Sequence, residues 1–199
     1  MGKVRRHKKV LITLGIIVAV FLVGGILWMC GPPVSASTNG PFISAEQAKV
    51  LAEKTIADYV SNPPSSDLEW NEKSEVTYMQ PEYDLVGNIV AYDCRVETDN
   101  KQTGGIFVTT QGKGNVHSVY PSGKATCDMK TQTALGRDAK EGDYIINVAE
   151  CGYDVALKSK NNTYIVAEMS REPKTVSERT FLWHAWWYKH NPLQGYIAS

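Results

Sequence analysis

Cysteine and histidine side chains are the residues of this chain that could perform nucleophilic chemistry or bind a metal ion. A cysteine thiolate activated by a nearby histidine is the nucleophile of cysteine hydrolases, and both residue types bind zinc. Downstream of an apolar N-terminal segment, the candidates are Cys94, Cys127, Cys151, His117, His184 and His190.

The spacing of these residues does not support either chemistry. Cys94 falls in the middle of a predicted strand, on its apolar face, where a cysteine usually serves as a small hydrophobe. None of the cysteines belongs to a C-x-x-C pair, and His184 and His190 have no further ligands at matching spacing. Phosphate-binding and nucleophile-elbow motifs are also absent from the sequence. We therefore predict no catalytic residue, no metal site and no cofactor.

A disulfide is a second use for the cysteines, because an exported domain permits one. Our first choice pairs Cys127 with Cys151, which encloses a loop of middle length. Cys94 would then remain an unpaired thiol. The alternative, that all three are small buried hydrophobes, stays open.

An uncharged apolar run at residues 10–30 determines where the protein works. As a helix it would span about 30 Å, enough to cross the core of a bilayer. It fits an uncleaved signal anchor, which would make a single-pass membrane protein with an extracytoplasmic C-terminal domain. It also fits a signal peptide, because Val34-Ser35-Ala36 is a small-residue cleavage site before Ser37. Either interpretation exports the rest of the chain.

Charge separates the chain into two unlike parts. Five of the 21 basic residues precede the apolar run, whereas all 21 acidic residues follow it. The exported part therefore carries a net charge of about −5, without the clustered basic face that nucleic acid requires. We divide the chain into residues 1–36 as signal or anchor, 37–43 as linker, and 44–199 as one extracytoplasmic domain.

The first half of the domain has the pattern of a helix followed by strands. Ser44 and Gln47 form a capping-box pair ahead of an apolar stripe at helical spacing. In residues 89–97, apolar residues alternate with Ala91, Asp93, Arg95 and Glu97, as in a half-buried antiparallel strand. These patterns predict an α+β fold, in which the N-terminal amphipathic helix covers an antiparallel β-meander.

The second half is less regular. Residues 121–143 are polar and predict an irregular connection, whereas 144–149 predicts a strand. Asn161-Asn162 predicts a tight hairpin turn between two further strands. Thr175 and Glu178 form a second capping-box pair, which predicts a final helix.

Aromatic residues crowd that final helix. Their number exceeds what one helix face can bury, so some of them could lie exposed at a membrane interface or a protein partner. The alternative is that they anchor the helix to the core. The candidate interface residues are Trp183, Trp186, Trp187 and Tyr188.

Residues 44–48 (SAEQA), 83–92 (YDLVGNIVAY) and 104–108 (GGIFV) follow a recognisable order. Over residues 43–120 the chain resembles the pro-region of streptopain-type cysteine proteases and the related small inhibitor proteins. The cysteine and histidine motifs of the mature protease do not follow, so the resemblance implies a non-catalytic module that occupies a protease cleft.

These observations predict a non-catalytic binding module at the cell envelope, either secreted or tethered to the membrane through residues 10–30. Its partner would be a protein such as a cysteine protease. The alternative is an envelope structural protein whose aromatic C-terminal helix lies in the membrane interface.

Overall fold

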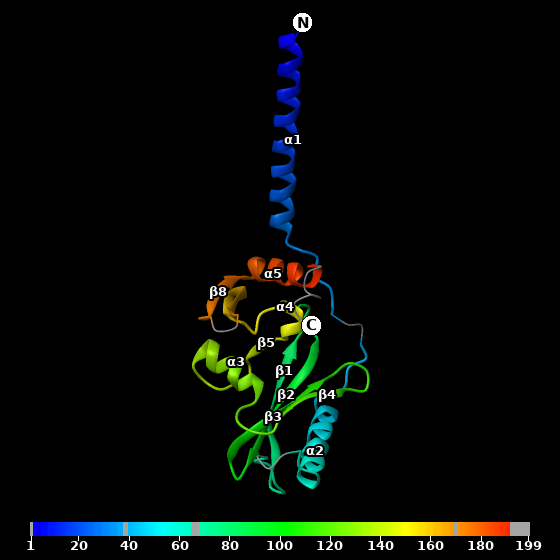
Figure 1. The fold of residues 1–199 in the computed structure, drawn as a ribbon, viewed down its shortest axis with the longest axis vertical. Coiled ribbons are helices and arrows are strands. Elements are labelled where there is room, and N and C mark those ends of the chain that lie inside the picture. Colours follow the sequence, from blue (N-terminus) through cyan, green and yellow to red (C-terminus); the bar gives the residue numbers. More distant parts are fainter. Residues whose placement is uncertain (1, 38–39, 65–67, 169–170, 192–199) are drawn as a thin grey trace. The chain divides into compact units, whose positions relative to one another are not determined.

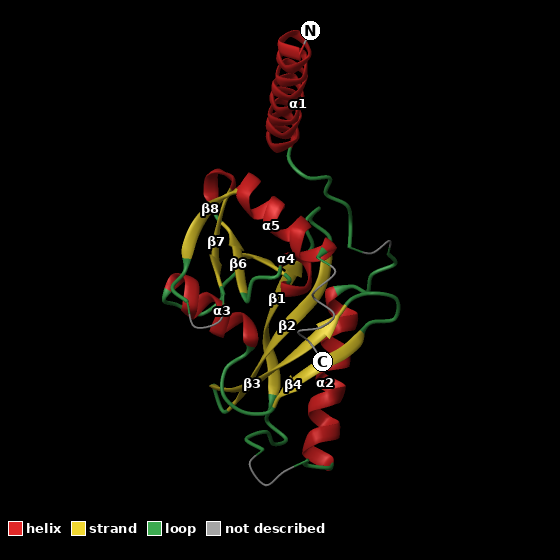
Figure 2. Ribbon diagram, turned by 45° about the horizontal axis from the view of Figure 1, so that its top comes forward, coloured by secondary structure: helices red, strands yellow, loops and turns green. Residues whose placement is uncertain are grey.

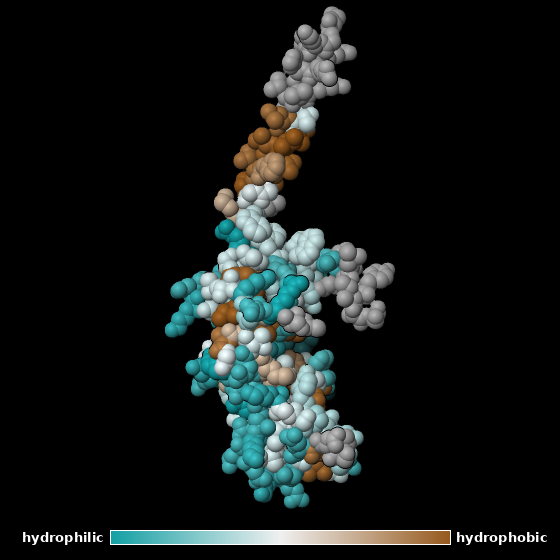
Figure 3. Space-filling view, turned by 60° about the vertical axis from the view of Figure 1, so that its left-hand side comes forward, coloured by the Kyte–Doolittle hydropathy of each residue, from teal (hydrophilic) through white to brown (hydrophobic). Residues whose placement is uncertain are grey.

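The computed structural model describes residues 2–37, 40–64, 68–168 and 171–191, and it divides into two compact units. The first unit, Met1–Pro33, contains the helix α1 (Gly2–Cys30). Within α1, Thr13–Cys30 is long and apolar enough to cross a membrane, a property that signal sequences share. Its apolar side chains form the brown band of Figure 3. The second unit, Val34–Ser199, contains the sheet and the remaining helices (Figure 1).

The second unit is built on one mixed sheet of eight strands, in the order β4-β3-β2-β1-β5-β6-β7-β8. Neighbouring strands are antiparallel except β1 and β5, which are parallel. The strands are β1 (Glu75–Tyr83), β2 (Ile89–Thr98), β3 (Lys101–Thr109), β4 (Asn115–Tyr120), β5 (Tyr144–Ile146), β6 (Val155–Lys158), β7 (Thr163–Ala167) and β8 (Lys174–Ser177). The predicted α+β class is confirmed, with a larger, mixed sheet (Figure 2).

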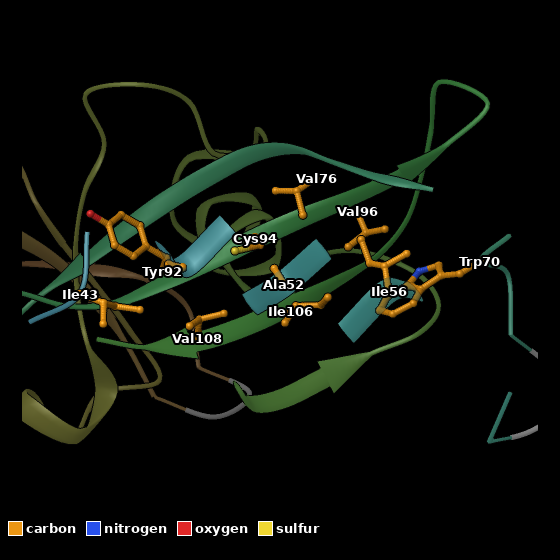
Figure 4. Close-up of a cluster of buried hydrophobic side chains, with 11 residues drawn as sticks. Ile43, Ala52, Ile56, Trp70, Val76, Tyr92, Cys94, Val96, Ile106 and Val108 are labelled. Carbon is orange, nitrogen blue, oxygen red and sulfur yellow. The ribbon is translucent and has the colours of Figure 1, made fainter. Parts of the chain in front are cut away.

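Helix α2 (Ala45–Ser61) begins at the predicted capping box. The Ser44 hydroxyl accepts the amide N–H of Gln47, and the Gln47 side chain accepts the amide N–H of Ser44. The helix buries Ala48, Ala52 and Ile56 in a cluster with residues of β1, β2 and β3 (Figure 4). The sheet residues of that cluster include Val76, Tyr92, Cys94, Val96, Ile106 and Val108.

Residues 121–143 are not the irregular connection that their composition predicts. They contain helix α3 (Thr126–Leu135), which ends at Gly136 in the left-handed conformation. Three of the four side chains that α3 buries are polar, namely Asp128, Lys130 and Thr131. The prediction failed because an apolar stripe is the usual sign of a packed helix, and α3 packs mainly through polar groups.

The predicted strand at 144–149 is also shorter than expected. It ends at Ile146, and a one-turn helix α4 (Val148–Cys151) follows, with the Asn147 side chain accepting the amide N–H of Ala149 as its cap. The predicted turn at Asn161-Asn162 is confirmed, since both residues have positive φ between β6 and β7.

Helix α5 (Glu178–His190) begins at Ser177, whose hydroxyl accepts the amide N–H of Thr180. The predicted start at Thr175 is wrong because Thr175 pairs with β7 as part of β8. Phe181 and Ala185 are the buried side chains of the helix.

Helices α3 and α5 pack against opposite faces of β6. Val155 and Leu157 belong to a cluster with Cys127 of α3, whereas Ala156 belongs to one with Cys151 and the buried residues of α5. All three domain cysteines are buried free thiols. The structure therefore does not contain the disulfide predicted for Cys127 and Cys151, because their side chains pack in separate clusters.

The contact between α4 and α5 gives a matched stability test. Gly152 and Gly136 both have φ near 70°, but a Cβ at Gly152 would lie 2.1 Å from Cδ2 of Tyr188, whereas one at Gly136 would meet nothing within 4 Å. We expect Gly136→Ala to lose roughly 1–2 kcal/mol of unfolding free energy from backbone strain. Gly152→Ala should lose about 1–3 kcal/mol more, because the added methyl group displaces the Tyr188 ring. Urea unfolding measures both, and equal losses would contradict this packing.

Candidate functional site

In the described part of the chain, the three domain cysteines are buried, and His117, His184 and His190 contact aromatic rings. Burial raises the pKa of the Cys94 and Cys151 thiols to about 12, and it raises that of Cys127 further. His184 stacks on the ring of Tyr153, with 3.9 Å between ring centroids. Within the described residues, no group of three or more His, Cys, Asp and Glu side chains is arranged to hold a metal ion.

The four aromatic candidates of α5 divide between packing and exposure. Trp183 and Trp186 are half-buried and meet edge to face, with ring centroids 5.7 Å apart. Tyr188 is half-buried over Gly152. Trp187 is 64% exposed. One of the four side chains therefore faces solvent over most of its surface.

A pocket of about 630 Å³ lies on the sheet face opposite α2. Phe107 of β3 faces this pocket, while its neighbours Ile106 and Val108 pack in the α2 cluster. Residues of α3 and α4 complete the lining. The apolar lining residues are Phe42, Val90, Ala91, Phe107, Val148 and Ala149.

A buried ion pair forms the polar part of this pocket. Glu82 of β1 is fully buried and pairs with the ammonium group of Lys130 on α3. The Asn147 amide donates a 2.8 Å hydrogen bond to the other carboxylate oxygen of Glu82. Burial alone would lower the pKa of Lys130, but the adjacent Glu82 carboxylate holds it above its ordinary value. Lys130 therefore stays charged, as buried ammonium groups with a carboxylate partner do.

Asp93 lies beside this pair, on the same face of the sheet. Its cross-strand neighbours are Gln80 and Phe107, and its carboxylate accepts the amide N–H of Cys127 in the first turn of α3. The residue before α3, Ala125, has no side chain that could cap the helix, so a carboxylate from β2 performs this role. The Oδ1 atom of Asp93 and the hydroxyl of Thr126 have no hydrogen-bond partner.

A second ion pair, between Arg95 and Asp128, joins β2 to α3. The guanidinium donates to both carboxylate oxygens, at 2.9 Å from Nε and 2.6 Å from Nη2. The amide N–H of Ala139 and the side chain of Gln102 donate to the same carboxylate. Asp128 is therefore saturated, which fixes α3 and with it one side of the pocket.

No protein-family model, curated protein or solved structure matches this chain. The pocket must therefore be interpreted from its own contacts.

Sequence reasoning identified Asp93 as a residue on the polar face of β2 but placed that face towards solvent. It missed Glu82, Lys130 and Asn147 as members of a site. The available signal was the presence of Asp93 and Arg95 on one strand face, since a charge that becomes buried there requires a partner. Without a helix predicted at 126–135, no partner could be named.

The pH dependence of stability tests the position of Asp93. Burial, reinforced by the nearby Glu82 carboxylate, raises the pKa of Asp93 to about 7 from the model-peptide value of 3.8. Between these values the folded state binds a proton that the unfolded state has released, so stability falls as pH rises. In the wild type, the unfolding free energy should fall by at most about 1.4 kcal/mol per pH unit from this group. We expect Asp93→Asn to reduce this slope. At pH 8 the variant should unfold at a higher urea concentration than the wild type.

The control for this measurement is Asp154→Asn, which changes an exposed carboxylate. It should leave the slope between pH 4 and pH 7 unchanged. A slope that is the same in Asp93→Asn and the wild type would contradict a buried, proton-binding Asp93.

Proposed function

We propose that residues 34–199 form a non-catalytic binding module at the cell envelope, which takes a side chain or short segment of a protein partner into the 630 Å³ pocket. The observation that carries this proposal is the combination of apolar walls with the Thr126 hydroxyl, which has no hydrogen-bond partner among the described residues. Ligand pockets have this character, with a few polar groups that fix orientation inside an apolar cleft.

The polar groups favour a partner group that is neutral and forms hydrogen bonds. Lys130 and Glu82 already compensate each other's charge, so this pair offers no free counter-charge to a further full charge buried beside it. The Thr126 hydroxyl lines the pocket and has no hydrogen-bond partner among the described residues, and a peptide amide could offer it a donor or an acceptor. A protein segment with a small or apolar side chain fits these groups and the apolar walls.

Two further features support this proposal. The raised pKa of each buried thiol disfavours the thiolate that a cysteine hydrolase needs, which supports a non-catalytic role. Helix α1 is apolar enough to act as a membrane anchor or an export signal, which supports a location of residues 34–199 outside the cytoplasm. The resemblance of residues 43–120 to streptopain-type pro-regions favours a papain-type cysteine protease as the partner.

Titration of residues 34–199 into papain and streptopain, with residual peptidase activity as the readout, tests the proposal. We expect micromolar or tighter inhibition. Ala149→Trp, which fills the pocket from its rim, should weaken inhibition about tenfold or more, equivalent to about 1.4 kcal/mol. Ala57→Trp places the same indole on the exposed side of α2 and should change nothing. Absence of inhibition at micromolar concentrations would reject the protease partner, and equal effects of the two variants would reject the pocket.

The exposed side chain of Trp187 favours a second function, in which α5 lies in the membrane interface of an envelope structural protein. For this function, residues 34–199 should float with phosphatidylcholine–phosphatidylglycerol vesicles, and Trp187→Ala should lower the bound fraction several-fold. Val50→Ala removes an apolar side chain of α2 that is 60% exposed and should have no effect. Flotation that is absent, or equal in both variants, would reject this function.

A further inference from the structure

Asp84 stands at the end of β1 and has no surface exposed to solvent. Its Oδ1 atom accepts the amide N–H groups of Val86 and Asn88, at 3.0 and 2.8 Å, and so closes the turn into β2. Its Oδ2 atom accepts the side-chain amide of Asn88 at 3.0 Å. The carboxylate therefore belongs to a rigid turn rather than to a mobile loop.

Asp84 and Asp93 are the two buried carboxylates of the described residues that form no ion pair, and of these two only Asp84 has its pKa lowered. Glu82 pairs with Lys130 and Asp128 pairs with Arg95, but no Lys, Arg or His of the described residues forms an ion pair with Asp84. Burial acts to raise its pKa, yet the hydrogen bonds from Asn88, Ser37 and Val86 hold it below the ordinary value. Asp84 is thus a buried negative charge, and such charges are usually paired.

The backbone nitrogen of Ser37 contacts Asp84 and could become a cation. Its N–H lies 3.3 Å from Oδ2 of Asp84, and its hydroxyl lies 3.5 Å from the same atom. These contacts join two residues that are 47 positions apart. In an intact chain this nitrogen is a neutral amide, but it would be an α-ammonium group if Ser37 were the first residue.

The residues before Ser37 independently fit a cleavage site. Val34-Ser35-Ala36 has small residues at the first and third positions before the bond, as bacterial signal cleavage sites do. Helix α1 ends at Cys30, and residues 31–36 are neither helix nor strand. A segment without helix or strand between an apolar helix and the bond is what a membrane-bound signal peptidase can bind.

We propose that a signal peptidase hydrolyses the Ala36–Ser37 bond, and that Asp84 then binds the new α-ammonium group of Ser37. Water supplies the hydroxyl group that leaves Ala36 with a carboxylate, and the released amine of Ser37 takes up the proton. The weak 3.3 Å contact from one amide N–H becomes a charge-assisted contact from a group with three N–H donors. Ser37 also lines the pocket, so this ion pair fixes the mature N-terminus beside the proposed binding site.

The position of the cut is tested by expressing the full chain in an exporting bacterium and measuring the intact mass of the product. We expect a chain that begins at Ser37. Ala36→Arg places a large charged side chain next to the bond and should leave the product uncut and membrane-bound. A wild-type product that keeps residues 1–36, or begins elsewhere, overturns the proposal.

The capture of the amine is tested on the processed protein by following reductive methylation of the α-amine as a function of pH. We expect the pKa of the Ser37 amine to lie about one unit or more above the ordinary range of about 7.7–8.0. Asp84→Asn should return it to that range, because asparagine still accepts the amide N–H groups of the turn but carries no charge. Asp58→Asn, at an exposed position of α2, should not alter it.

The wild type in concentrated urea supplies an internal reference that does not depend on either variant folding. Tyr144 lies close enough to Asp84 to interact with its charge, and the pKa of Tyr144 lies above its ordinary value, so this side chain stays neutral over the pH range of the experiment. The acidic, basic and histidine residues that line the pocket with Ser37 are Glu82, His117, Lys130, Glu150 and Asp154, and they are the same in the wild type and in Asp84→Asn. An amine whose pKa is the same in the folded and unfolded protein overturns the ion pair, whatever the outcome of the pocket experiments.

Discussion

The fold depends on a buried polar contact between helix α3 and strands β1 and β2. Glu82 pairs with Lys130, Arg95 pairs with Asp128, and Asp93 caps the first turn of the helix. Removing one partner from such a pair leaves a buried charge, which typically costs about 3–5 kcal/mol, whereas the intact pair adds little net stability. These contacts therefore define one position and orientation of α3 more than they stabilise it. The same contacts fix the shape of the pocket on this side, because α3 supplies part of the pocket wall.

Different interactions attach the helices to the two faces of the sheet. On the α2 side, apolar side chains of the helix and strands interdigitate, and small changes of helix position cost little as long as volume is conserved. On the α3 side, directional hydrogen bonds between charged groups allow no such adjustment. A binding site gains from the second arrangement, because the groups that meet a partner must be held in place before it arrives.

The same difference explains how much of the structure could be predicted from the sequence. Helix α2 and the strands from β1 to β4 follow from local signals, namely a capping box, alternating apolar residues and glycine turns. Helix α3 leaves no apolar stripe, so its existence depends on partners that lie more than thirty residues away in the chain. The pocket could therefore not be predicted from the sequence, although the pattern of β2 did place Asp93 and Arg95 on one strand face. The disulfide prediction was wrong for a related reason. Spacing along the chain does not indicate which face of the sheet a cysteine packs against, and Cys127 and Cys151 pack in separate clusters.

The parallel pairing of β1 with β5 has a consequence for how residues 34–199 fold. Residues 44–120 contain α2 and four strands that pair with their neighbours in sequence, so they can assemble from local contacts as they emerge. Until residues 144–146 arrive, β1 is the outer strand of this partial sheet and presents an unpaired row of backbone groups. Open strand edges of this kind recruit other chains. The docking of β5 then covers the end of this edge, at Glu82 and Tyr83.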